Sequence, residues 1–207
     1  MGDRQMINTL NTLNVTVAVN DHHDEYQFEK SYWGDCTNTF DEDQKHYIYA
    51  NFMQIPVNHY RFNVNNKSIL DIGGGPSSML LKCCDLKRGM VIDPIEYPHW
   101  TKERYASKNI QVNVDEGENN TETGWDEVWI YNCLQHVHDV NKLIQQAKKS
   151  AKVLRIFEWI NVPPHDGHPI ELTKQLLDSI IGIPGSGTVH LAERGCYGTA
   201  YYGVFNL

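Results

Sequence analysis

The sequence lacks any long apolar run. Nothing in its 207 residues approaches the roughly eighteen consecutive apolar positions of a membrane-spanning helix. The start, "MGDRQMINTLNTLN", has no basic segment followed by an apolar one, so we expect no secretion signal. The five cysteines are odd in number and show no Cys-x-x-Cys spacing. We therefore expect reduced thiols and a cytoplasmic protein.

Clustered positive charge is also missing. The chain has 18 Lys and Arg against 26 Asp and Glu, a formal net charge of −8, and its densest basic stretch is "AKKSAK" at 147–152. A nucleic-acid groove needs clustered cations that replace phosphate counterions. The charge pattern therefore disfavours a nucleic-acid partner and leaves a small molecule as the expected one.

From residue 68 onward, short β-branched runs alternate with helical stretches. Strands are predicted at 68–72, 89–93, 110–114, 127–132 and 152–159. Helices are predicted between them and after them, at 76–84, 98–107, 139–150 and 170–181. This alternation indicates right-handed crossovers and a Rossmann-like, mostly parallel α/β sheet with helices on both faces. The tail, 187–193 and 198–207, predicts a closing antiparallel β-hairpin.

The first 60 residues show no clear strand pattern. "FDEDQKHYIYANFMQI" (40–55) has apolar residues at helical spacing behind an acidic first turn, which predicts a helix. Residues 26–40 mix aromatic side chains with turn formers. We interpret residues 1–60 as an N-terminal helical cap or lid of the same domain, whose main part spans 61–207.

Three consecutive glycines follow the first predicted strand, in "SILDIGGGPSSM" (68–79). In a doubly wound sheet the ligand lies beyond the carboxyl ends of the strands, so this turn faces it. Gly73 and Gly75 let backbone amides approach a ligand closely, and they permit dihedral angles closed to other residues. The acid Asp71 lies just before them.

Three kinds of ligand compete for such a loop. A phosphate-binding P-loop needs Lys-Ser/Thr behind the glycines, whereas "PSSMLLK" follows here. A dinucleotide fingerprint fits only with Ser78 as its last small residue, and Pro76 is awkward in that pattern. S-adenosylmethionine has a cationic amino-acid tail and no phosphates, and Asp71 suits that tail. The loop therefore favours S-adenosylmethionine.

Acids follow the next two predicted strands. Asp93 ends the second strand, 18 residues past Gly75, where a carboxylate can bind both ribose hydroxyls. As an alternative, Asp93 and Pro94 form only a turn into the next helix. The run "DEGENN" (115–120) follows the third strand. It offers an acid for the adenine amino group, or else it is a solvated acidic loop.

Taken together, four stretches resemble the successive motifs of class I S-adenosylmethionine-dependent methyltransferases. They are "SILDIGGGPSSM", "GMVIDPIE", "VDEGEN" and "WDEVWIYNCLQHVHDVNKLIQQAKKSAKVLRIFEW". The resemblance covers residues 68–159 in detail, and the terminal hairpin agrees with the family's seven-stranded sheet. It implies a methyltransferase domain that binds S-adenosylmethionine.

The resemblance also implies positions for the cofactor. The glycine loop would surround the methionine moiety. Asp93 and Pro94 would contact the ribose. Glu118 would contact the adenine, with Asp115 as the alternative. Asn132, at the end of the fourth strand, would contact the methionine end. The complete set of predicted cofactor residues is Asp71, Gly73, Gly74, Gly75, Asp93, Pro94, Asp115, Glu118 and Asn132. Ser77 and Glu118 depart from the family's more frequent glycine and aspartate.

The sequence says less about which residues surround the methyl acceptor. Glu158 and Trp159 end the fifth predicted strand and should face the cleft, and "NVPPHDGHPIE" (161–171) follows them. His165 or His168 is a candidate general base, or both cap a proline-rich loop. Glu158 with both histidines could hold a metal, but no metal-ligand spacing in this loop supports that, so we expect none.

Other side chains should shape the acceptor pocket. His136 lies in the signature after the fourth strand, and aromatic residues of the lid are in reach of the cleft unless they only pack in the core. The predicted pocket residues are Trp33, Tyr32, His136 and Trp159.

The expected function is methylation of a small molecule at oxygen or nitrogen. The alternatives are methylation of nucleic acid or protein, a cofactor-binding module without transfer chemistry, and a nicotinamide-dependent oxidoreductase. "NVPP" (161–164) resembles the Asn-Pro-Pro motif of DNA amino-methyltransferases, but it follows the fifth strand rather than the fourth and contains an extra valine. A DNA-base substrate is therefore rejected.

Overall fold

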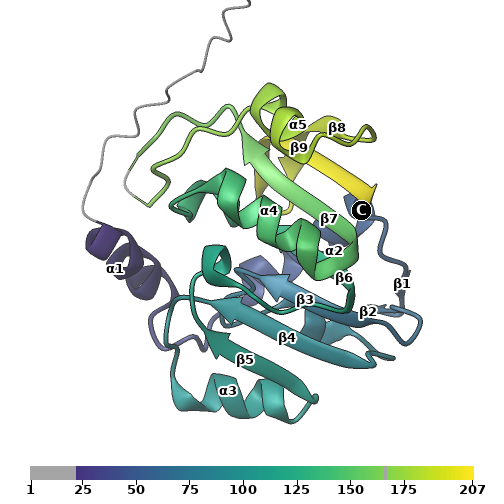
Figure 1. Cartoon of the computed structure of the whole chain (residues 1–207). Helices are drawn as coiled ribbons and strands as arrows, with labels where there is room; N and C mark the ends of the chain where they lie inside the picture. The colour runs from purple at the N-terminus through teal and green to yellow at the C-terminus, as the bar shows by residue number, and fades with distance from the viewer. Residues whose placement is uncertain (1–21, 166) are drawn as a thin grey trace, which may run out of the picture.

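One seven-stranded sheet forms the centre of the computed structural model, which describes residues 22–165 and 167–207 (Figure 1). The strand order is β5-β4-β3-β6-β7-β9-β8. In chain order the strands are β3 (Ser68–Ile72), β4 (Arg88–Asp93), β5 (Ile110–Val114), β6 (Trp125–Tyr131), β7 (Ala151–Ile160), β8 (Gly187–Glu193) and β9 (Cys196–Asn206). Strands β3 to β7 pair in parallel, and β9 pairs antiparallel with β7 and β8. This topology confirms the predicted fold class.

Helices cover both faces of the sheet. They are α1 (His22–Trp33), α2 (Phe40–Phe52), α3 (His99–Ala106), α4 (Val140–Ser150) and α5 (Lys174–Ile181). Apolar side chains of α4 and α5 pack in one core cluster and those of α2 in the other. In Figure 1, α4 lies in front of the sheet and α2 behind it. Within the described part of the chain, no helix is long and apolar enough to cross a membrane.

The sequence explains the best-defined helix. Leu143, Ile144 and Ala147 are fully buried, at the three- and four-residue spacing of one helix face. Asp139 caps the helix, because its carboxylate accepts a hydrogen bond from the backbone N–H of Lys142 at 2.9 Å. Both features of α4 agree with the prediction for 139–150.

The helix predicted at 76–84 is wrong. The chain there makes one 3₁₀ turn, η1 (Met79–Lys82), and Cys83 is already extended. Cys83 bridges to Phe62, and the N–H of Cys84 donates to the carbonyl of Phe62 at 3.1 Å. This pairing with the small hairpin of β1 (Val57–Asn58) and β2 (Arg61–Phe62) ends the turn. Helix α2, from the N-terminal region, packs on this face of the sheet instead.

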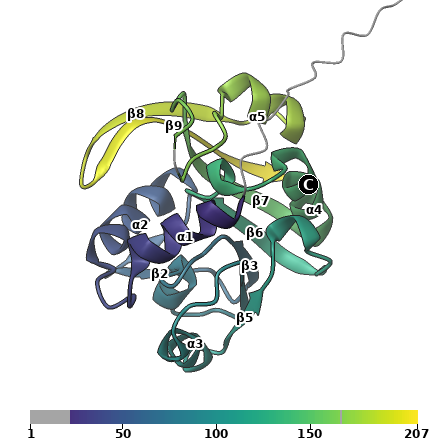
Figure 2. The same ribbon diagram turned by 90° about the vertical axis from the view of Figure 1, so that its left-hand side faces the viewer.

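The chain reverses direction along the sheet between β3 and β6. From β3 it runs outward through β4 to β5, and it then returns to β6 on the other side of β3. Loops that leave the carboxyl ends of two such strands diverge, which opens a crevice between them. Figure 2 looks onto these carboxyl ends and shows α1 crossing in front of them.

Candidate functional site

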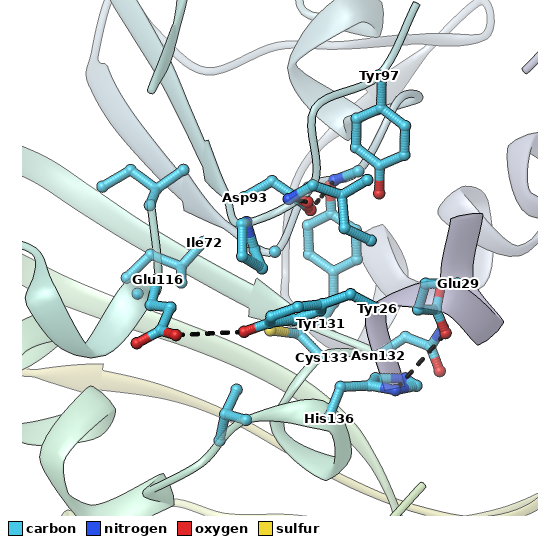
Figure 3. Close-up of a pocket in the computed structure, with 18 of the residues that line it drawn as sticks. Tyr26, Glu29, Ile72, Asp93, Tyr97, Glu116, Tyr131, Asn132, Cys133 and His136 are labelled. Atoms are coloured by element: carbon cyan, nitrogen blue, oxygen red, sulfur yellow. Dashed lines mark hydrogen bonds and ion pairs between the residues drawn. The ribbon is translucent and has the colours of Figure 1, made fainter. Parts of the chain in front are cut away.

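A cavity lies at this switch point, enclosed by the loops after β3, β4, β5 and β6 and by α1 and α2 (Figure 3). Its volume is about 100 Å³. Sites for ligands of nucleoside size or larger hold roughly 300–1,000 Å³. The cavity in this structure is therefore smaller than a site of that kind.

The three glycines serve different purposes. A Cβ on Gly73, where φ is +75°, would lie 2.2 Å from Sγ of Cys133, and one on Gly74 would lie 2.7 Å from Oδ2 of Asp71. Packing alone excludes a side chain at both positions. Gly75 has φ +59°, and the nearest atoms to its Cβ would be 3.8 Å away, on Trp33 and Tyr97. A Cβ on Gly75 would make only ordinary van der Waals contacts, so the positive φ, and not packing, is what favours glycine there.

Asp71 lies behind the glycine loop and not in the cavity wall. It is fully buried, and its Oδ2 accepts hydrogen bonds from the hydroxyls of Ser78 and, at 2.6 Å, Tyr131. Its Oδ1 has no partner among the described residues. Burial raises the pKa of Asp71 to about 7. Asp71 fixes the end of the loop through Ser78, and its predicted contact with the ligand stays a prediction.

Asp93 lines the cavity at the end of β4, next to Pro94. Its two carboxylate oxygens accept backbone N–H groups, from Gly75 and from Ile95, each at 3.0 Å. Asp93 thus ties the glycine loop to the next strand. Burial raises its pKa to about 6, against these two hydrogen bonds, which lower it.

The acids after β5 divide into three roles. Asp115 does not line the cavity, and its carboxylate accepts a hydrogen bond from the N–H of Glu116 at 2.8 Å. Glu118 lines it, but its Oε1 accepts backbone N–H groups of His138 at 2.8 Å and Asp139 at 3.1 Å. Glu116 also lines it, and its Oε1 lies 3.1 Å from Nε2 of His138. Glu116 was not singled out from the sequence, although it stands in the acidic run that was.

Asn132 lines the cavity from the turn after β6, with φ +50°. Glu158 holds this turn in place, because its carboxylate accepts the N–H groups of Cys133 at 3.0 Å and Leu134 at 3.1 Å. Glu158 is fully buried, and burial raises its pKa to about 8. It does not reach the cavity wall, so its position suits support of the turn.

Three histidines from two separate stretches of the sequence, His136 and the pair His165 and His168, lie close together beside the cavity. The ring of His168 lies 4.5 Å from that of His136 and 4.4 Å from that of His165, between centroids. Only His136 lines the cavity, and its Nδ1 lies 3.6 Å from a carboxylate oxygen of Glu29 (Figure 3). Burial, and then the charge of His168, lower the pKa of His136 to about 4. The base role of His165 or His168 stays a prediction.

The two remaining predicted pocket residues lie outside the cavity wall. Tyr32 is on the exposed side of α1, with 58% of its surface accessible. Trp159 packs edge-on against Phe157, with ring centroids 5.5 Å apart. Trp33, in contrast, lines the cavity as predicted.

Helices α1 and α2 each turn one face toward the cavity. Tyr26, Glu29 and Trp33 follow the i, i+3, i+7 spacing of one face of α1. Glu42 and His46 stand four residues apart on α2. Because both helices lie in the region interpreted as a cap, the cap contributes directly to the site. Helical spacing was the signal that would have identified Glu29 and Glu42.

A buried polar network supports His46 from behind. Nζ of Lys82 lies 2.6 Å from Oδ1 of Asp43 and 2.6 Å from Nδ1 of His46, and the hydroxyl of Ser77 donates to the same Asp43 oxygen at 3.1 Å. His46 is fully buried. Burial lowers its pKa well below its ordinary value, with the charge of Lys82 adding to the effect. Within residues 22–165 and 167–207, no three His, Cys, Asp or Glu side chains are arranged to hold a metal ion.

Comparison with known proteins gives similarity in structure only. No protein-family model matches the sequence, and no curated protein matches it. A SAM-dependent methyltransferase from Aquifex aeolicus superposes with a TM-score of 0.60 at 17% identity, over 87% of this chain and 98% of that one. The N-methyltransferase NodS from Bradyrhizobium japonicum, in complex with S-adenosylhomocysteine, superposes with a TM-score of 0.60 at 12% identity, over 88% of this chain and 98% of that one. A SAM-dependent methyltransferase from Thermotoga maritima, described as a possible histamine N-methyltransferase, superposes with a TM-score of 0.56 at 12% identity, over 87% of this chain and 97% of that one.

These structures are similar to the chain over nearly all of their length, at identities too low to show more than the fold. The chain therefore has the fold of the class I S-adenosylmethionine-dependent methyltransferases.

Proposed function

We propose that this protein is a methyltransferase that uses S-adenosylmethionine and methylates a small molecule at oxygen or nitrogen. The observation that carries the proposal is the composition of the cavity wall. An open glycine turn is followed by acids after both β4 and β5, and no described Lys or Arg lines the cavity. Such a wall suits a nucleoside with a cationic tail and does not suit a pyrophosphate.

The residues present fit this cofactor. Asp93 would accept the ribose hydroxyls, and Glu116 or Glu118 would accept the adenine amino group. The backbone of the glycine loop, which lines the cavity at Gly75, and the turn at Asn132 would hold the methionine end. When bound, the cofactor supplies a methyl group on a positively charged sulfur.

The protein's part in the reaction is mainly alignment. Holding an acceptor in line with a methyl group replaces an encounter in solution, which supplies about 7–11 kcal/mol of a barrier. Helices α1 and α2 close over one side of the cavity and line it. The same closure favours a small acceptor over a macromolecule, because the wall facing the turn after β6 is built by Glu29, Trp33 and His46 and not by an open surface.

Two measurements test the proposal. Isothermal titration calorimetry with S-adenosylhomocysteine should give binding that Asp93→Ala abolishes and Glu103→Gln preserves, since the Glu103 side chain is 67% exposed. Binding of NADH with none of the thioether would refute it. Incubation of methyl-labelled S-adenosylmethionine with the protein and a cell extract should then place label in low-mass products. Label in nucleic acid or protein would favour the macromolecular alternative, and no transfer would favour a non-catalytic binding module.

A further inference from the structure

One ring nitrogen of His46 is left without a partner at the wall of the cavity. The ring lines the cavity, and the side chain is only 1% exposed. Its Nε2 is buried and has no hydrogen-bond partner among the described residues. Buried polar groups are rarely left unsatisfied, so this nitrogen indicates that a bound molecule completes the wall. His46 has no role in the cofactor contacts assigned above.

Lys82 determines where the proton of His46 lies. Its Nζ is 2.6 Å from Nδ1 of His46 and 2.6 Å from Oδ1 of Asp43, whose charge favours the ammonium form of Lys82. An ammonium group only donates hydrogen bonds, so Nδ1 is the acceptor. Burial, and then the charge of Lys82, lower the pKa of His46 well below its ordinary value, so the ring is neutral at pH 7. Its one proton is therefore on Nε2, which needs a partner with a lone pair.

Other donors at this end of the cavity already have partners. The backbone N–H groups of Gly73 and Gly75 donate to oxygens of the protein at 2.7 Å and 3.0 Å. The hydroxyl groups of Ser77 and Tyr131 donate to carboxylates of the protein at 3.1 Å and 2.6 Å. The N–H of His46 is thus available to a ligand where these neighbouring groups are already engaged.

A carboxylate oxygen is the partner that suits this N–H best. Lys82 lies on the far side of the ring, and its effect on the pKa of His46 exceeds the opposite effect of Asp43. The positive charge strengthens the ring as a donor, and hydrogen bonds with one ionised partner are roughly twice as strong as neutral ones. No Lys or Arg lines the cavity in the part of the chain that the structure describes, so an anionic group has no ammonium or guanidinium there to bind instead.

The acids nearest in the chain and in the wall do not exclude a carboxylate. Glu42, one turn before His46 on α2, is paired with Lys45, with 3.0 Å between Oε2 and Nζ. Asp93 and Glu118 each accept two backbone N–H groups. Their charges are therefore partly balanced within the protein.

We propose that His46 is a binding residue whose Nε2–H donates to a carboxylate oxygen of a molecule bound in the cavity, with Lys82 as the positioning residue that holds it in this form. The proposal rests on the proposed methyltransferase function. The carboxylate belongs either to the amino-acid tail of S-adenosylmethionine or to the methyl acceptor. The location favours the tail, because the ring of His46 lies 6.0 Å from that of Tyr131, which directly precedes the turn at Asn132 assigned to the methionine end.

The test uses the full chain and two ligands. Isothermal titration calorimetry compares S-adenosylhomocysteine with its decarboxylated analogue, which keeps the amine. His46→Asn keeps an oxygen that accepts from Lys82 but lacks the distal N–H. It should weaken S-adenosylhomocysteine by about tenfold to a hundredfold, the range for losing a hydrogen bond to a charged group. It should bind the analogue within about twofold of wild type.

Two further variants complete the comparison. His46→Gln, whose amide N–H extends to about the position of Nε2, should recover part of the lost affinity. His99→Asn, at a side chain that is 83% exposed, should bind both ligands like wild type. Equal losses of the two ligands in His46→Asn would overturn the inference, because His46 would then only support the wall.

Nuclear magnetic resonance of nitrogen-labelled protein examines the proton itself. Wild type should show His46 as a neutral ring with its proton on Nε2, and Lys82→Met should reduce the fraction of this form. A proton on Nδ1 in wild type would overturn the inference. This readout depends on neither ligand nor turnover.

Transfer decides the source of the carboxylate if His46→Asn binds S-adenosylhomocysteine like wild type. Saturating methyl-labelled S-adenosylmethionine is then incubated with a deproteinised cell extract, and labelled products are identified by mass spectrometry. Reduced transfer by His46→Asn into a product that carries a carboxyl group would place the carboxylate on the acceptor. Unchanged binding without such a reduction would overturn the inference. Failure of wild type to bind either thioether would instead refute the proposed function.

Discussion

Cofactor binding should weaken at acidic pH because of Asp93. Its carboxylate lines the cavity and has a pKa of about 6, raised from the ordinary value by burial. If only the ionised form binds the ribose hydroxyls, about one molecule in eleven is competent at pH 5, and nearly all are at pH 8. The dissociation constant of S-adenosylhomocysteine should therefore rise about tenfold between pH 8 and pH 5.

The assay is calorimetry at half-unit steps of pH, with circular dichroism at each step to establish that the protein stays folded. Asp93→Asn is the matched variant, because asparagine keeps the shape of the side chain and does not titrate. We expect it to bind more weakly at pH 8 and to lose the acidic decline. A flat wild-type profile, or a decline of equal size in Asp93→Asn, would refute the assignment of Asp93 to the ligand.

Three further changes test the support around the site. In wild type the folded pKa of Glu158, about 8, lies above the ordinary 4.5, so the free energy of unfolding falls with rising pH between these two values. Glu158→Gln should remove this dependence. The advantage of wild type over the variant in urea unfolding should therefore shrink by about 1.4 kcal/mol per pH unit from pH 5 to pH 8. Gly73→Ala should lower the free energy of unfolding by about 2–5 kcal/mol, from its positive φ and the contact with Cys133, and Cys133→Ala should restore part of this loss. Tyr26→Phe should bind S-adenosylhomocysteine about two- to tenfold more tightly in calorimetry, because the Tyr26 hydroxyl, 3.4 Å from Glu116, competes with the ligand.

Each of these expectations has a contrary result. A stability difference that does not change with pH would mean that folding does not raise the pKa of Glu158. Full stability of Gly73→Ala would mean that the loop has room for a methyl group. Weaker binding by Tyr26→Phe would mean that this hydroxyl contacts the ligand itself.

The parallel sheet could be predicted from the sequence because its central strands, β3 and β6, are short and mostly buried β-branched or aromatic runs. All five residues of β3 are buried, for example, and Asp139 marks the start of α4 through its own side chain. These signals depend only on residues that are neighbours in the chain, so a single sequence contains them. The helix predicted at 76–84 failed because its end is set by pairing between Cys83 and Phe62, which lie 21 residues apart.

The glycine loop, Asp93 and the acidic run after β5 could likewise be found from order and spacing, since their places in the chain determine their places at the sheet edge. Their individual roles could not. Glu116 and Glu118 line the cavity and Asp115 does not, and the partners of these two acids, His138 and Asp139, lie about 20 residues further along the chain. The sequence by itself determined the fold and the position of the crevice, because strand order fixes where crossover loops diverge. Only the tertiary structure decided the other side of the wall, to which Glu29, Glu42 and His46 contribute, because that side depends on how two N-terminal helices pack over strands that come later in the chain.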